Sequence, residues 1–211
     1  MFIDYVALML LNMTAGFVVL AFFLLMGLQG ERKRWVAPFA MVGLVAFLAG
    51  LHMSFTWPLP GAYNSAFGET SVLLGIIYLG VALSLAKEWN PAPIAIYGIL
   101  AGLAAVVLGV RILDLQMTAK PPLAGAGFIL SGAGGILAAL AFCWPTSKGL
   151  RAIGALALIL AAIIWALTTY MAYWGHMDSF KNWKPATMSS PMETPAKTAP
   201  SLPNPPPKEA P

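Results

Sequence analysis

Six long apolar stretches alternate with short polar breaks over the first 175 residues of the chain. The stretches cover residues 3–28, 36–57, 68–86, 93–115, 122–144 and 151–175. An α-helix needs about 20 apolar residues to cross the hydrocarbon core of a bilayer, and each stretch is close to that length or longer. The breaks between them are short, so consecutive helices should be antiparallel. The sequence therefore predicts an all-α fold, an integral membrane bundle of six transmembrane helices.

The composition changes near residue 178. Residues 185–211 hold nine of the chain's 17 prolines and show no hydrophobic periodicity. Such a segment buries too little apolar surface to fold alone. We therefore predict a bundle over residues 1–177 and a Pro-rich extramembrane tail over residues 178–211. We expect another membrane-protein subunit to contact the tail and hold it in place.

The overall composition excludes most soluble classes of protein. Hydrophobic residues make up 59% of the chain and charged residues 9%, whereas a soluble domain averages about 25% charged residues. The net charge of +4 lies in short loops and in the tail, which favours a role in membrane topology over nucleic-acid binding. The single cysteine, Cys143, excludes a disulfide framework and a CxxC metal site.

Positive charge predicts the orientation of the bundle. The first, third and fifth loops carry six basic residues: Arg32, Lys33, Arg34, Lys87, Lys148 and Arg151. The other two loops have only Arg111 and Lys120 near them. Basic loops stay in the cytoplasm, so both termini should lie on the outer side of the cell membrane.

Small residues recur on one face of the fifth stretch. Gly127, Ser131 and Gly135 are spaced four residues apart, and such spacing lets two helix backbones approach closely. The contact could lie inside one bundle or between two copies.

Ionisable residues gather at the predicted outer ends of the spans, and the middle of each span has no charge. Two histidines, His52 and His176, and the carboxylate of Glu69 are expected at similar depth. Imidazole and carboxylate groups together bind zinc, copper or iron. Three arrangements stay open: hydrogen-bonded structural histidines, a metal site of His52, Glu69 and His176 completed by Asp4 or water, and a bis-histidine haem.

Two further features lie at the same predicted end. Arg111 and Asp114 are three residues apart and share a helix face, which predicts a structural ion pair, with Glu69 as the alternative partner. Aromatic residues flank the Pro-Leu-Pro-Gly turn of residues 54–69. They are typical of an interfacial belt, or they could form a lid over His52 and Glu69.

Three segments carry a resemblance to a known family. GLHMSFTWPLPGAYNSAFGE (50–69), AIYGILAGLAAVVLGVRI (95–112) and WALTTYMAYWGHM (165–177) resemble a family of small prokaryotic multi-pass membrane proteins, a domain of unknown function. The resemblance covers about residues 1–177. It implies a small membrane protein and no particular reaction.

The absence of charge in the middle of the spans argues against a pump or a channel. We therefore expect an accessory or structural subunit of a larger membrane complex of redox type, without catalytic activity of its own. One alternative is a metal- or haem-binding oxidoreductase at the outer face. Another is a small-solute transporter, which would need a polar cavity near mid-depth.

Overall fold

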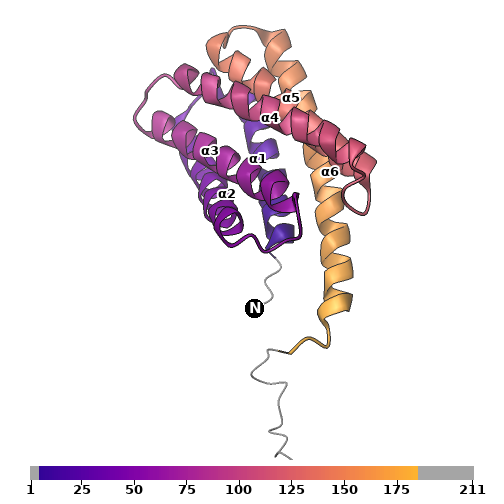
Figure 1. Cartoon of the computed structure of the whole chain (residues 1–211). Helices are drawn as coiled ribbons and strands as arrows, with labels where there is room; N and C mark the ends of the chain where they lie inside the picture. The colour runs from indigo at the N-terminus through magenta and orange to yellow at the C-terminus, as the bar shows by residue number, and fades with distance from the viewer. Residues whose placement is uncertain (1–4, 185–211) are drawn as a thin grey trace, which may run out of the picture.

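The structure is a computed structural model that describes residues 5–184, and the regular elements in this range are all helical. Short π- or 3₁₀-helical segments extend four of the long helices. In chain order the elements are α1 (Val6–Phe22), η1 (Phe23–Gly27), η2 (Lys33–Trp35), α2 (Val36–Thr56), η3 (Asn64–Glu69), α3 (Thr70–Ala86), η4 (Ala92–Ile94), α4 (Ala95–Asp114), α5 (Pro121–Cys143) and α6 (Lys148–Phe180) (Figure 1). Within residues 5–184, six helical segments are long and apolar enough to cross a membrane. The predicted fold class is thus confirmed.

The sixth helix is longer than its apolar stretch. The apolar stretch ends at residue 175, but α6 continues to Phe180 and contains 33 residues, about 50 Å at 1.5 Å per residue. Polar contacts support the last turn, because Ser179 donates to the carbonyl of Gly175 and Lys181 pairs with Asp178 at 2.9 Å. The rest of the predicted tail, residues 185–211, lies outside the described residues, as does Asp4.

The bundle consists of two helical hairpins and the pair formed by α1 and α6. The hairpins are α2–α3 and α4–α5, and α6 packs against both α5 and α1. By contrast, α3 and α4 contact each other only weakly. Glycines allow the close pairing within a hairpin: a Cβ atom on Gly132 of α5 would lie 2.3 Å from the carbonyl oxygen of Gly102 of α4. Contact between α3 and α4 is therefore much weaker than contact within either hairpin.

Two of the three small residues of α5, Gly127 and Ser131, make contacts inside this bundle. A Cβ atom on Gly127 would lie 2.8 Å from the ring of Trp165 on α6, and Ser131 accepts a hydrogen bond from that ring. A Cβ atom on Gly135 would meet no other atom within 4 Å. The three residues thus differ in role, although their spacing in the sequence is regular.

Loop contacts identify the two ends of the bundle. At one end, Lys33 of the first loop pairs with Glu88 of the third at 2.6 Å, and Gln29 donates to the carbonyl of Pro145 in the fifth. At the opposite end, the backbone N–H of Thr118 donates to the hydroxyl oxygen of Tyr63. The three basic loops therefore lie together. We call their end the inner end and the opposite one the outer end, after the predicted orientation, which stays a prediction.

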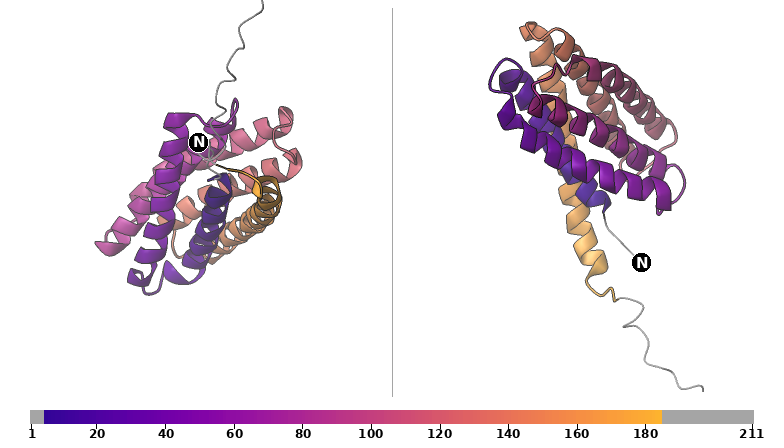
Figure 2. Two further views of the ribbon diagram at one scale, coloured as in Figure 1. Left: turned by 90° about the horizontal axis from the view of Figure 1, so that it is seen from below. Right: turned by 90° about the vertical axis from the view of Figure 1, so that its left-hand side faces the viewer.

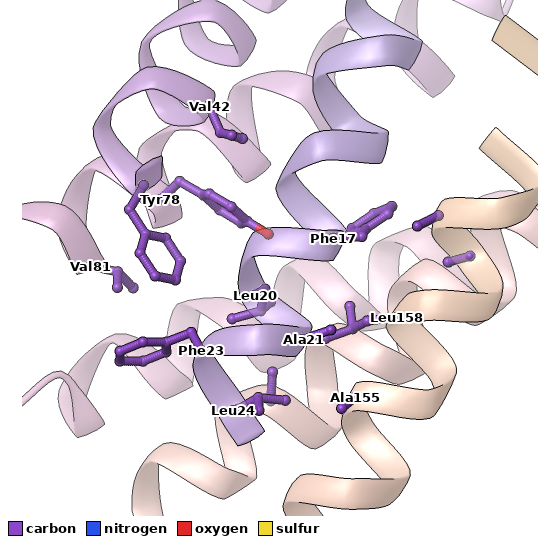
Figure 3. Packing of buried hydrophobic residues seen from close by; sticks show 14 of the residues in the cluster. Phe17, Leu20, Ala21, Phe23, Leu24, Val42, Tyr78, Val81, Ala155 and Leu158 are labelled. Carbon is purple, nitrogen blue, oxygen red and sulfur yellow. The ribbon is translucent and has the colours of Figure 1, made fainter. Parts of the chain in front are cut away.

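The hydrophobic core is centred on α1 and η1. The ring of Phe23 makes edge-on contacts with Trp35, Phe39 and Phe142, with ring centroids 5.2–5.9 Å apart. Figure 3 shows the side chains of α1 and η1 between those of α3 and α6, and the hydroxyl of Tyr78 directed at the backbone of α1. This hydroxyl donates to the carbonyl oxygen of Gly16 at 2.8 Å.

Candidate functional site

The three candidate metal ligands lie at the outer end, on three different helical segments. His52 is exposed on α2, and its ring packs edge-on against Tyr5 at 5.3 Å. Glu69 is exposed at the end of η3, and the ring of His176 on α6 lies 5.4 Å from that of Phe180. Among residues 5–184, no group of three or more His, Cys, Asp or Glu residues could hold a metal ion. Within this part of the chain, His52, Glu69 and His176 therefore do not form such a group, and the further ligand Asp4 lies outside it.

The length of α6 separates His176 along the bundle axis from the end of α5. The ammonium group of Lys120, just before α5, contacts the sulfur of Met171 at 3.5 Å. Met171 is therefore level with the outer end of α5, and His176 lies farther out along the same helix. The order of the spans predicts which end a residue occupies, but it does not predict how far a helix extends past its neighbours.

The predicted ion pair at the end of α4 is present. A guanidinium nitrogen of Arg111 donates to a carboxylate oxygen of Asp114, and both side chains are exposed. Arg111 also lies in the last turn of its helix, where a positive charge interacts favourably with the helix dipole. Asp114, rather than Glu69, is its partner. Because both side chains are exposed, solvent screens the pair and its contribution to stability is small.

A buried asparagine organises the outer loop between α2 and α3. Asn64 is fully buried; its side-chain oxygen accepts from the N–H of Leu59, and its amide nitrogen donates to the carbonyls of Leu59 and Gly61. These bonds hold the Pro-Leu-Pro-Gly turn in one conformation. We call residues 57–64 the outer cap. Our sequence reading missed Asn64. The only signal was an asparagine directly after a turn, where its amide can bond to nearby backbone groups.

The aromatic residues of this loop face the neighbouring elements. Tyr63 stacks on Phe67 at 6.4 Å, and Phe67 packs edge-on against Phe128 of α5 at 5.5 Å. Tyr63 also accepts the hydrogen bond from Thr118 that joins the two outer loops. These contacts join the loop to α5 and to the other outer loop. By contrast, Phe55 and Trp57 are 81% and 51% exposed, as residues of the predicted interfacial belt would be.

An apolar cavity of about 110 Å³ lies between the two hairpins and α1. Its hydroxyl groups belong to Thr70, Tyr78 and Ser131, and each donates to a backbone carbonyl: those of Ala66, Gly16 and Gly127, respectively. The surface of the cavity is therefore made mainly of carbon atoms, and the hydrogen atoms of its hydroxyl groups are already used in hydrogen bonds to the backbone. A transporter of polar solutes would need the opposite arrangement.

The outer end of α6 stands clear of the other helices. Figure 1 shows its last turns continuing past the ends of the other helices, and the right view of Figure 2 shows the same. From Met171 to Phe180 the helix rises about 14 Å at 1.5 Å per residue. Trp174 and Met177 are 86% and 75% exposed on this part, and Tyr170, directly before it, is 63% exposed. Their spacing of four and three residues places them on one face, which we call the α6 stripe.

Comparison with known proteins gives a family but no characterised relative. No curated protein and no solved structure matches the chain. A family model matches residues 1–179, which include the first five helices and almost all of α6. Because this match spans most of the sequence, the chain belongs to the family described as "Protein of unknown function (DUF981)".

Proposed function

We propose that this protein is an accessory subunit of a larger membrane complex, that it has no catalytic activity of its own, and that its α6 stripe contacts a partner subunit. The observation that carries the proposal is the exposure of the stripe on a helix that outreaches its own bundle. Contiguous exposed apolar surface indicates an interface with a partner protein or with a membrane.

The length of α6 favours a protein partner over lipid. The hydrocarbon core of a bilayer is about 30 Å thick, whereas α6 is about 50 Å long. Trp174 and Met177 lie beyond the level of Lys120 and Met171, and both side chains are largely exposed. Helices that present apolar residues at such spacing bind into apolar grooves of partner proteins.

The composition of the stripe also fits an interface. Tyrosine and tryptophan are enriched among the residues that dominate binding energy, and such residues are surrounded by a polar rim. Here the Asp178–Lys181 ion pair lies beside Met177 and is exposed to solvent. The partner should therefore offer an apolar groove near the outer surface of the membrane.

Two observations support a role without catalysis. The candidate ligands His52, Glu69 and His176 do not converge, and the hydroxyl groups of the cavity donate to backbone carbonyls. The redox type of the complex stays a prediction.

The size of the native complex tests the proposal. Membranes would be solubilised in a mild detergent, and the tagged chain would be sized by native electrophoresis. We expect the wild type in a species larger than the monomer or a dimer of the chain. The double variant Trp174→Ala/Met177→Ala should run as the monomer.

Trp144→Ala is the matched control, since Trp144 is also exposed but follows α5 at the inner end. This variant should keep the large species, and circular dichroism should show unchanged helicity in both variants. A wild type that already runs as a monomer, or a double variant that keeps the large species, would contradict the proposal.

A further inference from the structure

We propose that the cavity between the α2–α3 and α4–α5 hairpins binds a segment of one acyl chain of a bilayer lipid. This inference concerns a site apart from the α6 stripe and does not rest on the accessory function. It follows from the shape, chemistry and position of the cavity.

The cavity is elongated along the helices. On α3 its lining runs from Thr70 to Val81, and on α5 from Phe128 to Phe142. These segments span about 16 Å and about 21 Å at 1.5 Å per residue. Both belong to membrane-length helices, so the long axis of the cavity follows the helices across the bilayer. Lipid chains extend in this same general direction.

The lining selects an apolar occupant. Apolar residues such as Leu73, Ile77 and Phe128 line most of the cavity, and its hydroxyl groups are bonded to backbone carbonyls. Water needs two to four polar partners to occupy a cavity, whereas apolar cavities of this size stay dry and bind small hydrocarbons. An empty cavity would also deprive its lining of dispersion contacts. A hydrocarbon chain would restore these dispersion contacts, and it carries no polar group that would be left unpaired.

The loose boundary between α3 and α4 provides the route of entry. These helices contact each other only weakly. On α4 the cavity is lined by small residues, including Gly98, Ala101 and Ala105, which leave room beside the helix. The opposite face of α4 is exposed at Leu100 and Leu103, as expected for a helix at the lipid boundary. The chains of surrounding lipids are thus the nearest and most abundant apolar groups.

Gly135 allows the cavity to be filled by mutation. It lines the cavity, and a Cβ atom built on it meets no other atom within 4 Å. Gly135→Leu should therefore occupy the space of the lipid chain without displacing a helix. Gly149→Leu is the matched control, because Gly149 is equally free of neighbours but lies at the start of α6, away from the cavity. Ala101→Leu offers a second filling variant, from the opposite wall.

The experiment measures lipid that stays with the purified protein. The full chain would be reconstituted in vesicles of phosphatidylcholine, extracted with a steroid-based detergent that has no acyl chain, washed, and analysed by native mass spectrometry. We expect wild type and Gly149→Leu to retain a phospholipid in near-stoichiometric amount, and Gly135→Leu and Ala101→Leu to retain several-fold less. Added phosphatidylcholine should raise the melting temperature of wild type but not that of the filling variants.

Equal retention by wild type and by the filling variants that stay folded would overturn the inference, as would a wild type that retains no phospholipid. A second preparation from native membranes separates the sources of an apolar chain. If this preparation carries an isoprenoid, and the vesicle preparation carries no lipid, the occupant is not a bilayer lipid and the inference is wrong.

Discussion

The indole N–H of Trp165 on α6 donates a hydrogen bond to the hydroxyl oxygen of Ser131 on α5 across 2.9 Å. Ser131 in turn donates to the carbonyl of Gly127 at 2.6 Å, and the ring of Phe128 packs edge-on against Trp165 at 5.3 Å. Trp165 is fully buried. This contact fixes α6 against α5. It lies on the inner side of Met171, where α6 passes the outer end of α5.

Removing the acceptor of Trp165 should destabilise the bundle. Ser131→Ala leaves the indole N–H buried without a partner, which costs about 1–3 kcal/mol. Thr168→Ala is the control, because its hydroxyl bonds only to the carbonyl of Ile164 within the same helix. Denaturant unfolding in mixed micelles, followed by tryptophan fluorescence, measures the difference. Equal stability of the two variants would show that the bond between the helices is unimportant.

Asn64 should determine the stability of the outer cap. Asn64→Ala removes the partner of the Leu59 N–H and of two carbonyls, for which we expect a loss of about 2 kcal/mol. Asn90→Ala is the control, since Asn90 is exposed and accepts only from the N–H of Ala92. Proteolysis within residues 57–63 should become faster in the first variant alone. An unchanged cleavage rate would contradict this role of Asn64.

Two glycines on α5 should respond differently to the same substitution. The Cβ atom of Gly132→Ala would lie 2.3 Å from the carbonyl oxygen of Gly102, so α4 and α5 must separate, at a cost of about 1–3 kcal/mol. The Cβ atom of Gly135→Ala would have no neighbouring atom within 4 Å, so this substitution should not destabilise the protein. Thermal unfolding in detergent compares the two. A similar loss in both variants would argue that glycine is needed for backbone reasons instead.

The ion pair between the inner loops should give a small dependence on pH. The ammonium group of Lys33, at 2.6 Å, lowers the pKa of Glu88 below its ordinary value of 4.5. A lowered pKa in the folded state means that the stabilisation is fully present above pH 4.5 and is lost as the pH falls through the folded value. Because both side chains are exposed, solvent screens the pair and the effect should be small.

The difference in melting temperature between wild type and Glu88→Gln, measured from pH 7 down to about pH 3, tests this dependence across the titration range of glutamate. The two curves should converge as the pH falls. Curves that stay parallel, or that diverge at low pH, would show that the pair contributes nothing in solution.

The sequence predicted the features that depend on residues close together in the chain. The membrane-spanning segments follow from the length of each apolar stretch, and the Arg111–Asp114 pair follows from a spacing of three residues on one helix. The grouping of the three basic loops at one end follows from the number of crossings.

Features that depend on the lateral arrangement of helices could not be predicted in the same way. Whether His52, Glu69 and His176 meet depends on which helices are neighbours and on how far α6 extends, and neither follows from hydropathy. The buried role of Asn64 was hidden because a buried and an exposed asparagine look alike in a loop sequence. The cavity depends on the weak contact between α3 and α4, although they are consecutive helices.

The proposed role of the α6 stripe is best tested by photo-crosslinking in intact membranes. A photoreactive aromatic side chain would replace Trp174 in one variant and Trp144 in another, both exposed in the isolated chain. We expect irradiation of the Trp174 variant to give a discrete adduct with a different protein, and the Trp144 variant to give no such adduct. Lipid adducts alone at Trp174, or an adduct of twice the mass of the chain, would contradict the presence of a partner subunit on the α6 stripe.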